Sequence, residues 1–466
     1  MKSEYKNFIL NVVYQILTYI FPLITIPYVS RVLGVENIGI YSYTFSIVSI
    51  FLLFAMLGLN NYGNREIAKV RDNREEISQC FSSIYLLQLS VNIIIFLSYI
   101  VYLLYFCKEF FLIAAIQLIY LSSVFFDVNW FYFGMEKFKM TITRNLIIKV
   151  TSILLIFLLV KNKQDLWLYT GIIAISTLIS QLYLFFKLPC FVDFKFVPLK
   201  EITKHIPGVT LLFIPVLAYS IYRVMDKVMI GAFSSVVELG YYENAERLIN
   251  IPISIVSALG VVMLPRMSYL LANDKTNLKK TILSSMHLVL ILSTIMAFGL
   301  FLIADEISVV MFGSDFIKSG SIIKAISVTI VISAWANVIR TQYVIPNGLD
   351  RIYVTSTIGG AVLNLASNLI FIKLYGALGA CIGTVIAELF VMLYQTIVCK
   401  RELEIYKYYR LLLKYSLHSF FIVWVAYLLA SDVDDVFTKL CVKIGVSILL
   451  FFVLERKYIW YSFLGK

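Results

Sequence analysis

The feature that most constrains the fold of this chain is a succession of apolar runs, each about 20 residues long, the length of helix that crosses a bilayer. The sequence has 466 residues, of which 60% are hydrophobic and 15% charged, and its mean hydropathy is +0.87. A soluble core of that size does not hide so much apolar surface from water. We therefore expect an all-α, polytopic membrane protein of about fourteen transmembrane helices. The runs lie near residues 8–30, 38–60, 79–106, 110–133, 142–160, 166–187, 206–231, 241–264, 281–304, 320–345, 353–374, 377–399, 409–430 and 436–455.

The basic residues predict how the chain is oriented in the membrane. Its net charge is +12, and about 26 Lys and Arg residues fall in the termini and even-numbered loops against about 8 in the odd-numbered loops, which places the first group in the cytoplasm. Both termini are then expected to be cytoplasmic. This alternation accounts for the charge, so we expect no nucleic-acid partner. The six cysteines show no metal or redox spacing, and we expect no cofactor and no metal.

The first twelve runs contain an internal repeat. A shift of 201 residues places 39–41 on 240–242, and a shift of 214 places the glycine, apolar, acid, base tetrad 134–137 on 348–351. Six runs per copy is an even number, so the two copies have the same orientation and are related by a pseudo-two-fold axis along the membrane normal. Two six-helix bundles of this kind enclose a central cavity. The expected parts are an N-terminal six-helix lobe at 1–190, a basic cytoplasmic linker at 191–204, a C-terminal six-helix lobe at 205–400, and extra helices 13 and 14 at 401–466.

Charged residues gather in the seventh and eighth runs, where apolar residues are expected. A charge at the centre of a membrane helix costs roughly 2.5 to 3.5 kcal/mol, so these side chains are expected to face a wet interior. Arg and Lys there suit an anionic, phosphate-bearing cargo. The expected lining residues are Arg223, Lys227, Arg247 and Asn250, with Asp226 and Glu243 as local ion-pair partners or coupling residues. A salt-bridge network that only ties the two helices together is the alternative.

Four other runs contribute candidates. On the first run, Asn11 and Gln15 are four residues apart and begin a polar helix face. Arg340 shares a face with Ser333 and Asn337 on the tenth run and is a further lining candidate. Asp127 and Glu388, near the ends of the fourth and twelfth runs, are candidates for coupling transport to protons and equally for packed hydrogen-bonding partners.

Three strings of residues follow one another along about 350 positions. They are Pro27, Arg31, Gly34, Gly39, Tyr41, Gly58, Arg65 and Ala68; then Asp127, Trp130, Gly134, Glu136 and Phe138; then Asp226, Lys227, Gly231, Gly240, Tyr241, Ala245 and Pro265. In order and spacing, this pattern resembles the Wzx-type polysaccharide lipid-carrier flippases, a branch of the multidrug/oligosaccharidyl-lipid/polysaccharide exporter superfamily.

The resemblance implies a transporter, not an enzyme. It would move undecaprenyl-diphosphate-linked oligosaccharide repeat units from the inner to the outer leaflet of the bacterial cytoplasmic (inner) membrane by alternating access, for capsule or O-antigen synthesis. A polysaccharide polymerase and a chain-length regulator would be its partners. The resemblance also implies a cationic cavity and adds Arg31 to its lining residues. The diphosphate and sugar need a polar path, whereas the lipid tail can stay in the bilayer.

Three other functions stay open. A drug or cation antiporter of the same superfamily would favour acidic residues in the cavity. A membrane oligosaccharide polymerase would need a sizeable outer loop, and the odd-numbered loops here are short. A flippase for the peptidoglycan precursor would share the mechanism and differ only in the head group.

Overall fold

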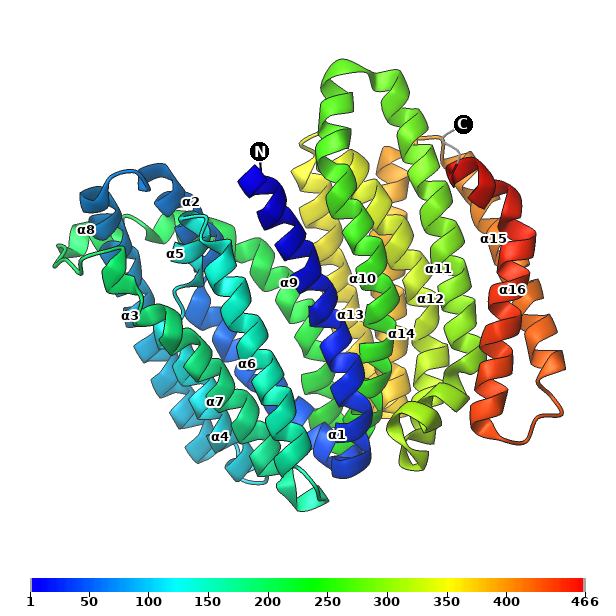
Figure 1. Cartoon of the computed structure of the whole chain (residues 1–466), viewed down its shortest axis with the longest axis horizontal. Coiled ribbons are helices and arrows are strands. Elements are labelled where there is room, and N and C mark those ends of the chain that lie inside the picture. The colour runs from blue at the N-terminus through cyan, green and yellow to red at the C-terminus, as the bar shows by residue number, and fades with distance from the viewer. Residues whose placement is uncertain (1, 464–466) are drawn as a thin grey trace. The chain divides into compact units, whose positions relative to one another are not determined.

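The computed structural model describes the backbone of residues 2–463 and the side chains of residues 23–213, 216–217, 220 and 223–456. Every regular element in this part of the chain is a helix (Figure 1). Within the described residues, twelve helical stretches are long and apolar enough to cross a membrane. The first of them, Leu23–Val70, holds parts of two expected runs, and the seventh expected run lies on a further helix, Ile206–Phe233, so the number is roughly consistent with the expected fourteen helices. The all-α, multi-pass membrane fold is confirmed.

Contacts divide the chain into two compact units, Met1–Val228 and Met229–Lys466. In the first unit, α4 and α6 both pack against α7, and α2 packs against α5. The boundary between the units, after Val228, falls inside helix α9 (Ile206–Phe233). The four-part domain scheme expected from the sequence stays a prediction. The helices of the first unit are α1 (Lys2–Met56), α2 (Leu59–Val70), α3 (Arg74–Tyr105), α4 (Phe111–Ser122), α5 (Asn129–Gly134), α6 (Phe138–Leu159), α7 (Leu166–Phe185), α8 (Leu199–Thr203) and most of α9 (Ile206–Phe233).

A single glycine separates the first two membrane segments. Gly34 has φ 77° and ψ 173°, and it interrupts the helical backbone of α1. A residue with a Cβ atom is strained at this positive φ, whereas glycine is not. The nearby Asn37 side chain donates to the backbone oxygen of Lys163, in the turn between α6 and α7, at 2.8 Å. The turn at Gly34 is thereby attached to the α6–α7 turn.

The contact between α2 and α5 depends on another glycine. A Cβ atom at Gly63 of α2 would lie 2.4 Å from the ring of Trp130 on α5. Trp130 is fully buried, and its indole N–H donates to the side-chain oxygen of Gln88 on α3 at 2.9 Å. The absence of a side chain at Gly63 lets α2 lie directly on this tryptophan. Both helices carry asparagines that line the cavity described below.

The second unit contains α10 (Val236–Asn273), α11 (Lys275–Phe312), α12 (Ile317–Ile339), a π-helical turn at Arg340–Val344, α13 (Asp350–Tyr375), α14 (Ala377–Cys399), α15 (Ile405–Leu429) and α16 (Val436–Phe463). The closest neighbours are α13 with α14 and α11 with α12. A Cβ atom at Gly379 would lie 2.0 Å from the backbone oxygen of Phe371, so α13 and α14 approach closely where they meet. Helices α15 and α16, the expected extra pair, pack on each other and on α11.

The two copies of the glycine, apolar, acid, base tetrad each lie where one helix ends and the next begins. Residues 134–137 lie in the turn between α5 and α6, and residues 348–351 lie where the π-helical turn passes into α13. Each tetrad includes one residue with positive φ, at its third position in the first copy (Glu136, φ 55°) and at its first position in the second (Gly348, φ 65°). The shift of 214 residues therefore relates two turns of similar position in their units.

Candidate functional site

The first unit contains a polar cavity of about 760 Å³. It has sixteen polar or charged lining residues out of twenty-one, in a helix bundle that is otherwise rich in apolar side chains. Six of the sixteen are amides, contributed by four helices of the unit. These four helices supply Asn60, Asn61 and Asn64 (α2), Asn129 (α5), Asn145 (α6) and Gln181 (α7). Amides both donate and accept hydrogen bonds, so the wall suits an uncharged polar ligand.

Arg144 of α6 is the buried cation of this cavity, with 6% of its surface exposed. One terminal nitrogen donates to the backbone oxygen of Ser180 at 2.9 Å and to Gln181 Oε1 at 3.3 Å. The other donates to Asn129 Oδ1 at 3.0 Å and to Asn145 Oδ1 at 2.7 Å. Acceptors from α5, α6 and α7 thus fix the position of the guanidinium group.

Asn129 joins Arg144 to a carboxylate. Its side-chain oxygen accepts from Arg144, and its side-chain nitrogen donates to Asp127 Oδ1 at 2.7 Å. The backbone N–H of Asn129 donates to the same carboxylate oxygen at 3.0 Å. Of the two roles that the sequence leaves open for Asp127, the structure shows the hydrogen-bonding one. The role of Asp127 in proton coupling stays a prediction.

Helix α6 places a polar stripe on the cavity wall. Asn145, Lys149, Ser152 and Ile156 all line the cavity, and they follow steps of four, three and four residues, which bring them to one helix face. Among the charged lining residues, Arg144 and Lys149 are two cations against the single carboxylate of Asp127. The formal charge of the wall is therefore positive by one.

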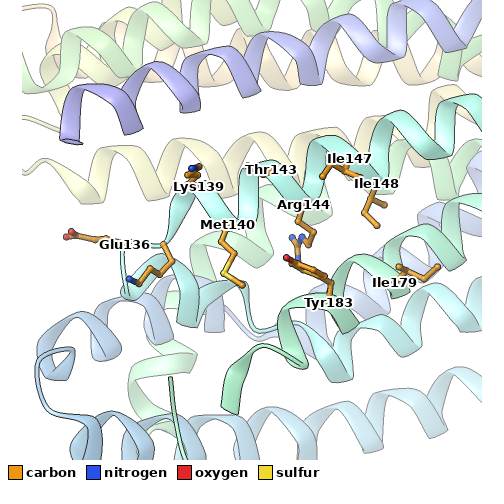
Figure 2. A pocket seen from close by; sticks show the side chains of 10 residues that line it. Glu136, Lys139, Met140, Thr143, Arg144, Ile147, Ile148, Ile179 and Tyr183 are labelled. Atoms are coloured by element: carbon orange, nitrogen blue, oxygen red, sulfur yellow. The ribbon is translucent and has the colours of Figure 1, made fainter. Parts of the chain in front are cut away.

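A second depression, of about 540 Å³, lies between α6 and α7 (Figure 2). We call it the α6–α7 groove. Its body is lined by Met140, Ile147, Ile148 and Ile179. Figure 2 shows Arg144 extending from α6 toward Tyr183 of α7. Arg144 and Ile148 line the cavity as well as the groove, so the two spaces adjoin each other at these residues.

One end of the α6–α7 groove is basic. Lys137 and Lys139 are exposed there, beside the turn between α5 and α6. Glu136 also lines this end, but it forms a salt bridge with Arg71, just after α2. The groove thus carries the lysine charges at one end and Arg144 next to its apolar body.

In the second unit, one expected ion pair is present. Arg247 Nε donates to Glu243 Oε1 at 2.8 Å, across one turn of α10, and both side chains are at least three-quarters buried. Glu388 of α14 accepts a hydrogen bond from Ser333 of α12 at 2.8 Å. Arg340, at the start of the π-helical turn, lies over the ring of Tyr353 at 5.9 Å.

The remaining candidates from the sequence lie on α1, α9 and α10. On α9, Asp226 is buried and Arg223 and Lys227 are half-buried, in the first unit. Asn250 is half-buried on α10, and Arg31 is exposed on α1 close to Gly34. Asn11 and Gln15 lie outside the residues whose side chains are described. That these residues line the substrate path stays a prediction.

Interpretation of the sequence missed Arg144, Lys149 and the six amides. The run 142–160 is apolar enough to be taken as an ordinary membrane helix, and the amides are spread over more than 120 positions. A signal was nevertheless present, because the helical spacing of Asn145, Lys149 and Ser152 marks a polar face on that run. Among the described residues, no group of three or more His, Cys, Asp or Glu side chains is placed to hold a metal ion.

A model of one protein family, described as polysaccharide biosynthesis protein, matches residues 5–271. The chain belongs to this family. A similar relative is a putative O-antigen transporter of Shigella dysenteriae, which is 25% identical over 84% of this chain and 98% of its own length.

Two solved structures have a fold similar to that of this chain. A lipid II flippase, MurJ, in an inward closed conformation has a TM-score of 0.73 and 20% identity, and the match covers 97% of this chain and 100% of that one. An inward-facing multidrug resistance transporter of the MATE family has a TM-score of 0.65 and 16% identity, over 82% and 94% of the two chains. At these identities the likeness concerns the fold.

Proposed function

We propose that this chain is a flippase for lipid-linked oligosaccharides. Its cargo would be undecaprenyl-diphosphate-linked repeat units, carried from the inner to the outer leaflet of the cytoplasmic membrane by alternating access. The observation that supports this most is the amide-lined cavity of about 760 Å³ with the buried Arg144 in its wall. A membrane protein gains no stability from such a space, and a sugar diphosphate cannot cross hydrocarbon without one.

The names of the similar proteins support the same conclusion. One relative is named an O-antigen transporter and the structural neighbour MurJ is named a lipid II flippase. Both names describe transport, and we propose that this chain, too, catalyses no covalent step. Its polymer would be a capsule or an O-antigen, with a polymerase and a chain-length regulator acting after it. Both chain termini would lie in the cytoplasm.

A drug or cation antiporter is the second candidate, because the multidrug transporter shares the fold. The charge of the first-unit cavity argues against it, since two cations and one carboxylate would repel a cationic cargo.

Deletion of the gene in its own host provides the direct test. Cells without the protein should accumulate lipid-linked repeat units in the cytoplasmic leaflet and lose the surface polymer. An accessibility assay with a membrane-impermeant lectin or glycosidase distinguishes the two leaflets. Normal surface polymer in the deletion strain, with no other flippase present, would refute the proposal.

Arg223 and Arg247 test the cationic part of the proposal. We expect Arg223→Ala and Arg247→Ala each to abolish surface polymer while membrane insertion persists, and lysine at either position to restore part of the activity. Because Arg247 pairs with the buried Glu243, Arg247→Ala also lowers stability.

The double variant Glu243→Gln with Arg247→Gln is the control for the loss of stability. It removes both charges, so stability should recover while transport stays lost. Recovery of transport in the double variant would mean that Arg247 only neutralises Glu243 and does not bind cargo.

A further inference from the structure

The geometry points to one continuous substrate site inside the first unit, formed by the α6–α7 groove, Arg144 and the polar cavity. We infer that it binds an isoprenoid diphosphate sugar with the isoprenoid chain in the groove, the diphosphate at Arg144 and the sugar in the cavity. The inference rests on the proposed function and specifies where each part of that cargo binds.

The α6–α7 groove has the surface that a hydrocarbon chain needs. Ile147 is 61% exposed and Ile179 is 50% exposed, on facing sides of the groove. Ile148 and Met140 line the same groove, Ile148 next to Ile147 and Met140 on the other side of Arg144 (Figure 2). Covering such apolar surface contributes about 25 cal/mol per Å² if it would otherwise meet water. Lys137 and Lys139 at the basic end add attraction for an anionic head group.

The polar cavity has the wall that a sugar needs. Its amides and hydroxyls can donate to and accept from the hydroxyl groups of a carbohydrate, and its volume of about 760 Å³ is within the range of pockets for small ligands, about 300 to 1,000 Å³. The apolar lining residues are few, and they are mostly isoleucines of α6 and α7.

Arg144 is placed where the two parts of the cargo join. It lines both the groove and the cavity, and its guanidinium group is held by acceptors from three helices. In the cargo, the diphosphate lies between the isoprenoid and the sugar. The protein therefore presents an apolar surface, a cation and a hydrogen-bonding cavity in the same order as the cargo presents its tail, its anion and its sugar.

Binding of farnesyl diphosphate to the purified full-length protein in nanodiscs tests the groove and Arg144. Inorganic diphosphate and farnesol should each bind at least about ten-fold more weakly, because each lacks one of the two contacts. Ile147→Trp fills the groove and should weaken binding of farnesyl diphosphate about ten-fold. Leu154→Trp is the matched control: Leu154 is also on α6, is 56% exposed and lies outside both spaces, so binding should not change.

Two further variants test Arg144 and the wall of the polar cavity separately. Arg144→Gln should weaken binding of both farnesyl diphosphate and inorganic diphosphate. Ser152→Leu, in the cavity wall, should leave farnesyl diphosphate binding unchanged and weaken binding of the lipid-linked oligosaccharide. Equal affinities of Ile147→Trp and Leu154→Trp for farnesyl diphosphate would overturn the inference, even if Arg144→Gln fails to fold.

Transport in cells distinguishes failure of this inference from failure of the proposed function. If Ile147→Trp and Ser152→Leu still deliver normal surface polymer, the protein is a flippase whose cargo binds elsewhere, and the inference is wrong. If farnesyl diphosphate binds as expected but deletion leaves surface polymer intact, the proposed function is wrong and the site binds an isoprenoid diphosphate for another purpose.

Discussion

His205 connects three helices at one end of the first unit. It lies directly before α9 and is 4% exposed. Its Nδ1 atom is 2.8 Å from the hydroxyl of Tyr62 on α2, and its Nε2 atom is 2.8 Å from the hydroxyl of Ser83 on α3. Burial lowers the pKa of His205, and the charge of Lys204 acts in the same direction, while Glu66 and Glu201 oppose it.

This lowered pKa predicts a pH dependence of stability. As the pH falls through about 6.5, the ordinary pKa of histidine, the unfolded chain takes up a proton before the folded protein does, so folding stability falls. We expect acidification from about pH 7.5 to 5.5 to lower the melting temperature more for the wild type than for His205→Gln. Thermal unfolding of the two purified proteins across this range measures the difference. Parallel curves would contradict the prediction.

Single residues differ in how far the sequence reveals them. The pair Glu243 and Arg247 was predictable, because the spacing of four along one helix decides the contact and no other element is needed. Arg144 was not, because its four acceptors come from α5, α6 and α7 and meet only through tertiary packing. Asp127 was recognised as a charge but not as a member of this network, since Asn129 links it to Arg144.

At the scale of elements, α16 is attached to α11 by a buried ion pair. Lys443 Nζ donates to Glu306 at 2.6 Å and to the backbone oxygen of Leu302 at 3.0 Å. The lysine side chain is 5% exposed and the carboxylate 11%. The sequence predicted that these last two helices form an appended pair, but not which helix of the bundle they pack on.

Breaking the ion pair between Lys443 and Glu306 should weaken the packing of α16 on α11 and lower the stability of the protein. Lys443→Met removes the cation that pairs with the buried carboxylate of Glu306. Breaking a buried ion pair in this way typically lowers the free energy of unfolding by about 3 to 5 kcal/mol. Lys407→Met is the control, because Lys407 forms an exposed pair with Glu404, worth about 0 to 1 kcal/mol. Reversible unfolding in detergent compares the two variants. A similar loss of stability in both would show that the Lys443 contact does not hold α16.

The helices themselves were the most predictable elements. Their length and apolarity follow from the thickness of the bilayer, so each run could be recognised without knowledge of its neighbours. The break between the first two runs was predictable in position, and the structure assigns it to Gly34 through its positive φ. The polar cavity required knowledge of which helix faces meet, and periodicity along one helix does not contain that information.

For the whole molecule, the distribution of basic residues predicts the topology. The loop before α8 should be cytoplasmic, and the turn between α6 and α7 should be on the outside. Cys190 is an exposed native thiol in the first of these places, and Lys163 is exposed in the second.

Labelling with a membrane-impermeant maleimide tests this orientation. In a Cys441→Ser background, a Lys163→Cys thiol should react in right-side-out spheroplasts, and Cys190 should react only in inside-out vesicles. Cys441 is removed because it is the other exposed native cysteine. The reverse pattern of labelling would invert the topology and with it the proposed direction of transport.

The four oxygens around Arg144 have a consequence for the speed of a transport cycle. A phosphate group that reaches the guanidinium competes with Ser180, Gln181, Asn129 and Asn145 for the same N–H groups. Each new bond therefore replaces an existing one, and the net gain is a fraction of what an unengaged arginine would provide. A carrier has to release its cargo as readily as it captures it, and an arginine already occupied by neutral acceptors limits the residence time of the diphosphate.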